Sequence, residues 1–289
     1  MTLDIKPYNY QSIKFMARHV LYRKYKWHSK GDSMTEITHN LKTGFIAGRI
    51  NWTENLFSLR IRIPGVVYTA GQFVKLALSD EDGELQRRAY SIVNHPKDYA
   101  QTGVIELLII TDPTGRLSPL LHKLRTGDEV YVSSEAAGFM TVNEIPTSQS
   151  DLWLLSTGTA IGPFLSMLEG DIENRFNHVT LVHAVRHKSE LVYQDKLESI
   201  KARLKSNFHY LPIVSREQVS GALHGRIPDL ISSGKLDQAV GKAMDKKGSF
   251  IYLCGNPQMV KDTSETLKSL GLTKHLRKEP GHFSSENYW

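Results

Sequence analysis

The chain has 289 residues, of which 40% are hydrophobic and 23% charged, and its formal net charge is +6. This length suits two domains, each able to bury its own core. The one cysteine, Cys254, excludes an internal disulfide and any iron–sulfur cluster or zinc site ligated only by cysteines of this chain. It also favours a reducing compartment, and we expect the cytoplasm. No apolar run approaches the roughly 18 residues that a transmembrane helix needs.

Most of the net positive charge lies in the first 33 residues, which hold seven Lys or Arg against Asp4 and Asp32. Without them the chain is nearly neutral, and nothing favours nucleic-acid binding. Residues 10–27 would suit a basic helix on a membrane surface, but the apolar core of a signal peptide is missing. We expect residues 1–40 to be a dispensable extension, either a flexible leader or a mis-assigned start, with translation beginning at Met34. The intact mass of the natively expressed protein tests this.

Six short segments rich in aliphatic and aromatic residues alternate with turn residues between residues 41 and 146. They predict strands over 45–51, 56–63, 72–79, 88–94, 104–111 and 129–134, with one short helix over 117–124. Short strands at this spacing indicate an antiparallel barrel or sandwich.

After a polar stretch at 143–150 the pattern changes, and short apolar runs alternate with helical ones. They predict strands over 152–156, 179–185, 208–214 and 250–254, and helices over 163–173, 189–204, 227–232 and 257–270. This alternation is typical of βαβ units around a parallel sheet. The predicted architecture is an antiparallel β domain (41–146) followed by an α/β domain (147–289), whose ligands would bind at the carboxyl ends of its strands.

Two motifs of the first domain could meet a phosphate. In Arg88-Ala89-Tyr90-Ser91, a strand would project Arg88 and Tyr90 from one face, roughly 7 Å apart. That face offers a cation for phosphate and an aromatic plane for stacking; the simpler interpretation is a solvated arginine beside a packed tyrosine. The segment Gly115-Arg116-Leu117-Ser118 offers free N–H groups and a hydroxyl to an anion, or is an ordinary helix start.

The α/β domain carries its candidate residues after its strands. The turn at 157–163 contains Gly158 and Gly162 and could hold a pyrophosphate on its N–H groups, although it lacks the G-x-G-x-x-G spacing. Three arginines that follow later strands would suit a 2′-phosphate, although each alone could be a solvated surface residue: Arg186, Arg216 and Arg226. The histidines form no metal-spaced cluster, and there is no catalytic triad.

Two features close the domain. The last predicted strand ends in Cys254-Gly255-Asn256-Pro257-Gln258-Met259, where the glycine lets backbone approach a ligand and the cysteine is either core or close to the site. The chain ends in Tyr288 and Trp289, although chain ends are usually polar. Such large rings should be covered, either by docking on the core or by stacking on a flat ligand.

These motifs, in this order and spacing, resemble those of plant-type ferredoxin/flavodoxin–NADP⁺ reductases, and more closely the bacterial subgroup that ends in Tyr-Trp. The resemblance covers residues 43–289 and includes 134–139 and 273–277. It implies a six-stranded FAD-binding β-barrel, a parallel-sheet α/β domain that binds NADP(H), and FAD bound without a covalent link.

The resemblance also implies, position by position, which residues bind each cofactor. FAD would be held by Arg88, Ala89, Tyr90, Ser91, Leu107, Leu108, Gly115, Arg116, Leu117, Ser118, Thr159, Tyr288 and Trp289. NADP would be held by Thr159, Val185, Arg186, Ser215, Arg216, Arg226, Asn256, Pro257, Gln258 and Asp262. Relatives often carry aromatic residues beside the flavin where this chain has Leu107 and Leu108.

The implied reaction is hydride transfer from NADPH to FAD N5, followed by one-electron transfers to flavodoxin or ferredoxin. Ser91 would hydrogen-bond near N5, Glu286 or Cys254 would orient the nicotinamide, and Trp289 would gate the step. We expect a monomer. One alternative is a flavin or ferric reductase that acts on small acceptors; another is a non-catalytic flavin- or nucleotide-binding module, which would show no yellow chromophore bleached by NADPH.

Overall fold

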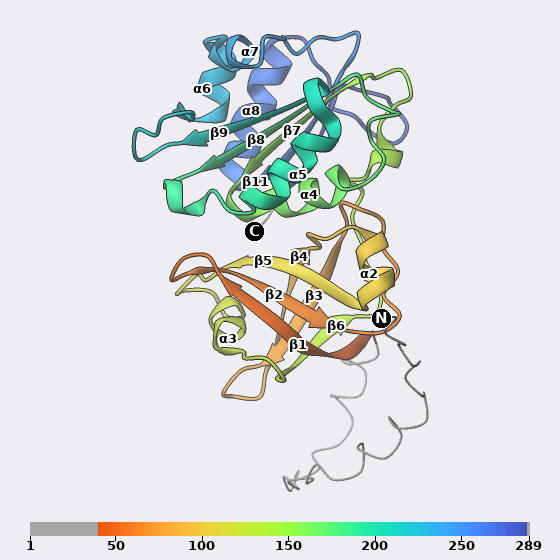
Figure 1. Cartoon of the computed structure of the whole chain (residues 1–289), viewed down its shortest axis with the longest axis vertical. Coiled ribbons are helices and arrows are strands. Elements are labelled where there is room, and N and C mark those ends of the chain that lie inside the picture. Colours follow the sequence, from red (N-terminus) through yellow and green to blue (C-terminus); the bar gives the residue numbers. More distant parts are fainter. Residues whose placement is uncertain (1–39, 288–289) are drawn as a thin grey trace, which may run out of the picture. The chain divides into compact units, whose positions relative to one another are not determined.

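Two six-stranded sheets, one after the other in the chain, organise residues 40–287, the part that the computed structural model describes (Figure 1). The expected N-terminal extension, with Met34, and the terminal Tyr288 and Trp289 lie outside the described residues. From Asn40 onward the chain forms one compact unit. Within residues 40–287 no helix has both the length and the apolar composition needed to cross a membrane.

The first sheet is antiparallel throughout and has the strand order β4-β3-β6-β1-β2-β5. Its strands are β1 Leu41–Asn51, β2 Leu56–Arg62, β3 Phe73–Ser79, β4 Leu85–Ser91, β5 Val104–Ile110 and β6 Glu129–Ser133. Just beyond β4, Ile92 bridges to Leu107 of β5, which brings the two edge strands together and closes the barrel. The predicted six-stranded barrel is confirmed.

Strand alternation sorts β5 into two sets of side chains. Ile105, Leu107 and Ile109 belong to the barrel core, and Leu107 has no exposed surface. The alternate residues, including Leu108, face outward and pack with the core of the second sheet. Strand β2 behaves in the same way, because Phe57, Leu59 and Ile61 fill the barrel while Leu56 faces out.

The sequence-based boundaries differ from the structure at two places in the barrel. Strand β4 begins at Leu85 rather than at residue 88, because the hairpin after Ser79 is tight and Leu85 pairs directly with Ser79. Residues 95–103 form helix α2 (Pro96–Thr102) rather than a turn. The His95 ring accepts the Lys97 N–H at the start of α2, and Gly103 ends it with φ 64°, so both boundary signals were present in the sequence.

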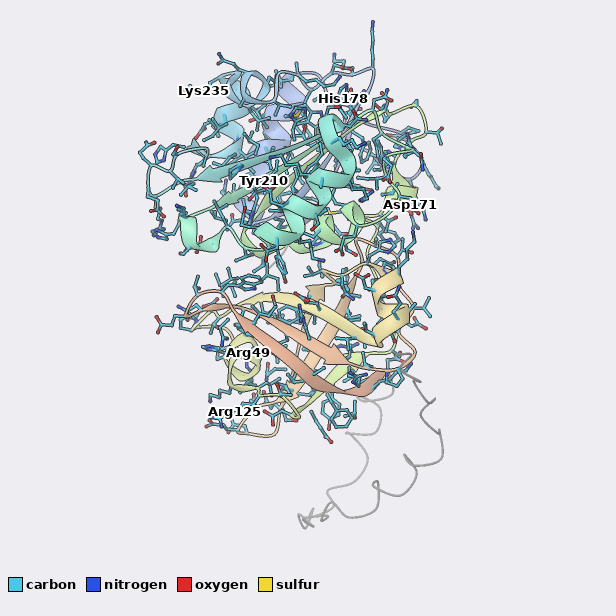
Figure 2. All side chains as sticks on the ribbon, viewed as in Figure 1. Arg49, Arg125, Asp171, His178, Tyr210 and Lys235 are labelled. Atoms are coloured by element: carbon cyan, nitrogen blue, oxygen red, sulfur yellow. The ribbon has the colours of Figure 1, made fainter. Side chains whose placement is uncertain are left out.

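The short helix expected at 117–124 is α3, Ser118–Lys123. Arg49 lies beside it (Figure 2) and donates to the carbonyl oxygens of His122 at 2.8 Å and Leu124 at 3.4 Å. A cation at this end of a helix satisfies carbonyls that lack partners within the helix. Arg49 therefore ties α3 to the barrel wall.

The second sheet is parallel throughout, in the order β10-β9-β8-β7-β11-β12. Its strands are β7 Asp151–Thr157, β8 His178–Val185, β9 Phe208–Val214, β10 Leu223–His224, β11 Ser249–Gly255 and β12 Phe283–Asn287. This confirms the predicted parallel α/β arrangement. The domain boundary between 146 and 147 stays a prediction.

Helices cover both faces of this sheet, α4 and α5 on one and α6, α7 and α8 on the other (Figure 1). Their bounds are α4 Ile161–Leu168, α5 Gln194–Leu204, α6 Ile227–Ser232, α7 Lys235–Val240 and α8 Pro257–Ser269, with single 3₁₀ turns at Val142–Glu144, Gly158–Ala160, Lys188–Glu190 and Lys205–Asn207. Both faces are apolar, so the strands read as continuous hydrophobic runs. Leu154 of β7 packs under α4 and α5, while its neighbour Trp153 packs on the opposite face.

Strand β12 was not predicted. Its sequence is Phe-Ser-Ser-Glu-Asn, in which only Phe283 is a large apolar residue. It pairs in parallel with β11, so that Glu286 lies opposite Cys254. The tail becomes a strand because β11 offers a free edge, and a polar five-residue segment carries no periodicity that would reveal this.

Candidate functional site

The second sheet reverses its strand order between β7 and β11. The chain runs from β7 outward to β8, β9 and β10, and then returns to β11 on the other side of β7. Loops at the carboxyl ends of two such strands diverge and leave a crevice between them, which is where ligands bind in open α/β sheets. The turn after β7 and the turn after β11 meet at this point.

Glycines shape both turns. Gly158 has φ 57° and Gly255 has φ 138°, conformations that residues with a Cβ rarely adopt. A Cβ on Gly255 would also lie 2.0 Å from the Thr157 hydroxyl oxygen. That hydroxyl accepts the Asn256 N–H at 2.9 Å, and this contact fixes the two turns to each other.

A buried histidine supports the turn after β7. The Nε2 atom of His183, on β8, lies 3.1 Å from the carbonyl oxygen of Gly158. A carbonyl only accepts, so Nε2 carries the proton, and Nδ1 is left without a partner. His183 is fully buried, and burial lowers its pKa to about 4, which keeps the ring neutral. In a trans peptide the N–H points opposite to the carbonyl, so this bond also orients the Thr159 N–H. His183 was not singled out from the sequence.

A cavity of about 330 Å³ opens at the carboxyl ends of the strands, and we call it the strand-end cavity. It brings together eight of the ten residues expected to bind NADP: Thr159, Val185, Arg186, Ser215, Arg226, Asn256, Gln258 and Asp262. Arg216 and Pro257 do not line it. The cavity wall also includes residues that the sequence did not indicate, among them Glu190 and Pro228.

The charges of the strand-end cavity favour an anion. Within residues 40–287, neither Arg186 nor Arg226 forms an ion pair. Glu190 accepts the backbone N–H groups of Arg186 and His187, at 2.8 and 3.1 Å, so its carboxylate holds the loop instead of neutralising a guanidinium. The arginines keep their charge for a ligand.

A second cavity, of about 490 Å³, lies at the rim of the barrel, and we call it the barrel-rim cavity. It brings together most of the residues expected to bind FAD: Arg88, Ala89, Tyr90, Ser91, Leu108, Gly115, Arg116, Leu117, Ser118 and Thr159. Glu286 and Asn287 of β12 complete its wall. Leu107 does not line it, because that side chain fills the barrel core.

The two arginines of the barrel-rim cavity differ in their partners. The Arg88 guanidinium bonds only the carbonyl of its neighbour Arg87, at 2.9 Å, and forms no ion pair within residues 40–287. Arg116 instead contacts the carboxylates of Asp80 at 3.1 Å and Glu84 at 2.6 Å. The charge of Arg88 is therefore free for a phosphate, whereas that of Arg116 is engaged by the β3–β4 hairpin.

The expected catalytic residues lie in different surroundings. Ser91 and Glu286 line the barrel-rim cavity. Glu286 accepts the Phe139 N–H at 3.1 Å, and burial raises the pKa of its carboxyl group. Cys254 is fully buried on β11 and lines neither cavity; burial raises the pKa of its thiol well above the ordinary value, so it stays protonated.

Leu108, Ile110 and Thr159 line both cavities. The two spaces therefore adjoin, and two flat groups bound in them could meet at this shared wall. The barrel-rim cavity carries the aromatic ring of Tyr90 and the cation of Arg88. The strand-end cavity carries the glycine turn at Gly158 together with Arg186 and Arg226. These features define a two-domain oxidoreductase that uses a flavin and a nicotinamide nucleotide.

Comparison with known proteins places the chain more narrowly. Residues 48–139 match the oxidoreductase FAD-binding domain, and residues 154–265 match the oxidoreductase NAD-binding domain. A flavodoxin/ferredoxin–NADP reductase of Escherichia coli (strain K12) is 47% identical over 249 residues, which cover 86% of this chain and 98% of the relative. A ferredoxin–NADP reductase of Pseudomonas aeruginosa is 35% identical over 258 residues, covering 86% of this chain and 97% of the relative.

Among solved structures, a ferredoxin NADP⁺ reductase from Neisseria gonorrhoeae with bound FAD and NADP matches with a TM-score of 0.80. It is 30% identical, and the match covers 86% of this chain and 99% of that one. The chain belongs to the flavodoxin/ferredoxin–NADP reductase family. The resemblance inferred from the sequence motifs is thereby confirmed.

Proposed function

We propose that this protein exchanges electrons between NADP(H) and flavodoxin or ferredoxin through a bound FAD. The observation that carries the proposal is the pair of adjoining cavities, which share Thr159, Leu108 and Ile110 and have unpaired arginines on their walls. Two cofactors whose rings must touch and whose phosphates must be held apart need this arrangement.

The barrel-rim cavity fits FAD by the chemistry of its wall. Arg88 offers an uncompensated cation to a phosphate, and the backbone of the turn at 115–118 lies on the same wall. Tyr90 offers an aromatic face, and burial raises its pKa to about 12, so the ring stays neutral. When bound, FAD takes up a hydride equivalent from NADPH and passes its electrons singly to the carrier. We assign Ser91 a hydrogen bond near the reacting end of the ring.

The strand-end cavity fits NADP(H). The turn at Gly158 would hold the pyrophosphate on its N–H groups, and Arg226 with Ser215 would hold the 2′-phosphate, with Arg186 nearby. Arg216 joins this set because its N–H donates to the Arg186 carbonyl at 3.0 Å. Asn256, Gln258 and Asp262 would line the remaining length, next to Pro257 at the start of α8.

Glu286 would orient the nicotinamide at the shared wall, because its carboxylate is anchored to the Phe139 N–H and lies in the cavity. Cys254, opposite Glu286 in the sheet, would act through that pairing. We propose that Tyr288 and Trp289, which follow the cavity residue Asn287, border FAD and that Trp289 gates access of the nicotinamide. Deletion of Trp289 should alter NADPH/NADH discrimination or FAD retention, and unchanged values of both would reject the gate.

A basic and partly apolar surface supports the carrier assignment. Arg277 stacks over the exposed ring of Phe139, 4.0 Å from its centroid, and Lys278 follows it; the Arg277 guanidinium also lies 3.9 Å from the Glu144 carboxylate. Phe139 also donates to Glu286 of the barrel-rim cavity, so this surface adjoins the FAD. An acidic carrier would be steered here. We predict that NADPH-dependent reduction of flavodoxin slows as ionic strength rises, and that Arg277→Glu both slows it and weakens the salt dependence; a salt-insensitive wild type would contradict the docking face.

The experiment that tests the function is stopped-flow reduction of the purified protein by NADPH and by NADH, followed by turnover with flavodoxin, ferredoxin and free FMN. We expect a yellow protein that NADPH bleaches much faster than NADH, with electrons passed to a carrier protein. Preference for free FMN would favour a flavin reductase, and a colourless protein that ignores NADPH would favour a binding module. We further propose a monomer in the cytoplasm, where the lone buried Cys254 needs no partner.

A further inference from the structure

Tyr193 has a strained backbone. It lies directly before helix α5 with φ 62° and ψ 32°, in the left-handed region. Within residues 40–287 only one other non-glycine residue has a positive φ, Lys205, which is exposed. Tyr193 is 6% exposed. A buried residue with a Cβ keeps this conformation only when its surroundings hold it there, and such strain gathers at functional sites.

Hydrogen bonds made by the Tyr193 hydroxyl hold the residue in this backbone conformation. The hydroxyl donates to the Glu106 carboxylate at 2.8 Å, and it lies 2.7 Å from the Ser58 hydroxyl. Because its one proton points at Glu106, Ser58 donates to it. Ser58 in turn accepts the indole N–H of Trp52 at 2.8 Å, and Arg60 donates to the other oxygen of Glu106 at 2.9 Å.

This chain of hydrogen bonds uses every donor once, from Trp52 through Ser58 and Tyr193 to Glu106. It is also dry. Ser58 has no exposed surface and Glu106 is 8% exposed, while the Tyr193 ring packs on Trp52 with centroids 4.8 Å apart. A buried and fully satisfied network specifies one arrangement of its members, and removing one member leaves the others without partners.

The network joins two walls of the strand-end cavity. Ser58 pairs with Leu108 across β2 and β5, and Glu106 is two residues before Leu108 on the same outward face. Leu108 forms the wall shared by both cavities. On the other side, Tyr193 follows Glu190 by three residues, and Glu190 lines the cavity and holds the Arg186 loop.

We propose that Tyr193 is a positioning residue for hydride transfer. Its hydroxyl fixes the distance between the shared wall at Leu108 and the loop at Arg186–Glu190, and so sets how closely the nicotinamide meets the flavin. This proposal rests on the function proposed above. Misplacement of two reacting rings by about 1 Å can cost about a hundredfold in rate, whereas Arg226 and Ser215, which would hold the 2′-phosphate, lie outside the Arg186–Glu190 loop.

The test compares Tyr193→Phe with Tyr68→Phe. Tyr68 is also buried, and its hydroxyl donates to the Asn94 carbonyl at 3.0 Å; neither residue lines the strand-end cavity or the barrel-rim cavity. For Tyr193→Phe we expect hydride transfer at saturating NADPH to slow by about tenfold to a hundredfold. The affinity for 2′,5′-ADP, measured by calorimetry, should fall much less than the rate, by no more than about threefold, because Arg186 is the only residue of the phosphate site that belongs to the loop held by Tyr193. The long-wavelength absorbance of a nicotinamide stacked on the flavin should weaken.

A further single variant, Ser58→Ala, and the double variant with Tyr193→Phe distinguish loss of the network from misfolding. Ser58→Ala leaves Tyr193 in place and breaks the same network, so it should slow hydride transfer in the same direction. The double variant should be less impaired than the product of the two single effects, because both act on one network. Rates for Tyr193→Phe and Ser58→Ala equal to those of Tyr68→Phe would overturn the proposal. A wild type that is not reduced by NADPH would instead overturn the proposed function.

Discussion

The two cavities are built in different ways. The strand-end cavity takes residues from successive loops at one edge of a parallel sheet, from Thr157 after β7 to Asn256 after β11. The barrel-rim cavity takes residues from the barrel strands β3, β4 and β5, the turn at 112–118, Thr159 and the C-terminal strand β12. In the first, topology alone brings the residues together. In the barrel-rim cavity, the ability to hold a phosphate depends on which side chains have no ion-pair partner. Within residues 40–287 Arg88 has none, whereas Arg116 is paired with Asp80 and Glu84.

The largest expected effect separates those two arginines. Arg88→Ala should weaken FAD binding by about tenfold to a hundredfold, because a charge-assisted bond to phosphate is lost and Arg116, the other arginine on the wall of the barrel-rim cavity, is already paired. Arg116→Ala should weaken it by no more than about threefold, since that side chain is already bound to Asp80 and Glu84. Fluorescence titration of apoprotein with FAD measures both. Equal losses would mean that Arg116 leaves the hairpin when FAD binds.

The second effect concerns coenzyme choice in the strand-end cavity. Arg226→Ala should reduce the ratio of kcat/KM for NADPH to that for NADH by about tenfold to a hundredfold, chiefly through KM for NADPH. FAD affinity should not change. Arg203→Ala is a matched control, because that arginine lies on helix α5, which covers the same sheet, but is paired with Glu173. If Arg203→Ala lowered the ratio as much as Arg226→Ala, the local assignment of the 2′-phosphate site would be wrong.

A smaller effect is a pH dependence that comes from His183, which supports the turn after β7 at the strand-end cavity. His183 has a folded-state pKa of about 4, below its unfolded value of about 6.5. The unfolded chain therefore takes up the proton first, and stability falls as pH drops from about 6.5 to about 4 and then levels off. This amounts to about 3 kcal/mol at full protonation of the unfolded state.

Chemical denaturation of wild type and His183→Gln between pH 7 and pH 4 measures this contribution. Glutamine can still donate to the Gly158 carbonyl but does not titrate, so its curve should be flatter by about 3 kcal/mol over that range. It should also keep NADP⁺ affinity, while His183→Leu should weaken it several-fold. Parallel pH curves for the wild type and His183→Gln would show that His183 does not stay neutral in the folded state.

The same contrast explains what could be predicted from the sequence. The parallel sheet was predictable because its buried strands read as apolar runs followed by turns, and the rule for carboxyl ends pointed to Arg186 and Arg226. The full set of ten residues, eight of which line the strand-end cavity, came from the family resemblance. On the barrel side the contiguous motifs at 88–91 and 115–118 were predictable. The ion pairs of Arg116 were not, because Asp80 and Glu84 lie on a hairpin far away in sequence.

Three other features could not be predicted from the sequence, each for a physical reason. His183 lies in the middle of an apolar strand, and nothing in the sequence shows that its ring reaches the Gly158 carbonyl. Leu107 and Leu108 are adjacent and chemically identical, yet only Leu108 reaches the cavity because strand sides alternate. The role of Tyr193 depends on Ser58 and Glu106 from another sheet, which no local pattern encodes.

Strand β12 has a consequence for how the protein is made. The ribosome releases the barrel long before it synthesises Glu286 and Asn287, and the whole of the parallel sheet is translated in between. The barrel-rim cavity cannot have its full wall until those residues emerge and pair with β11. A chain interrupted in its last few codons would therefore lack the part of the cavity wall that β12 supplies.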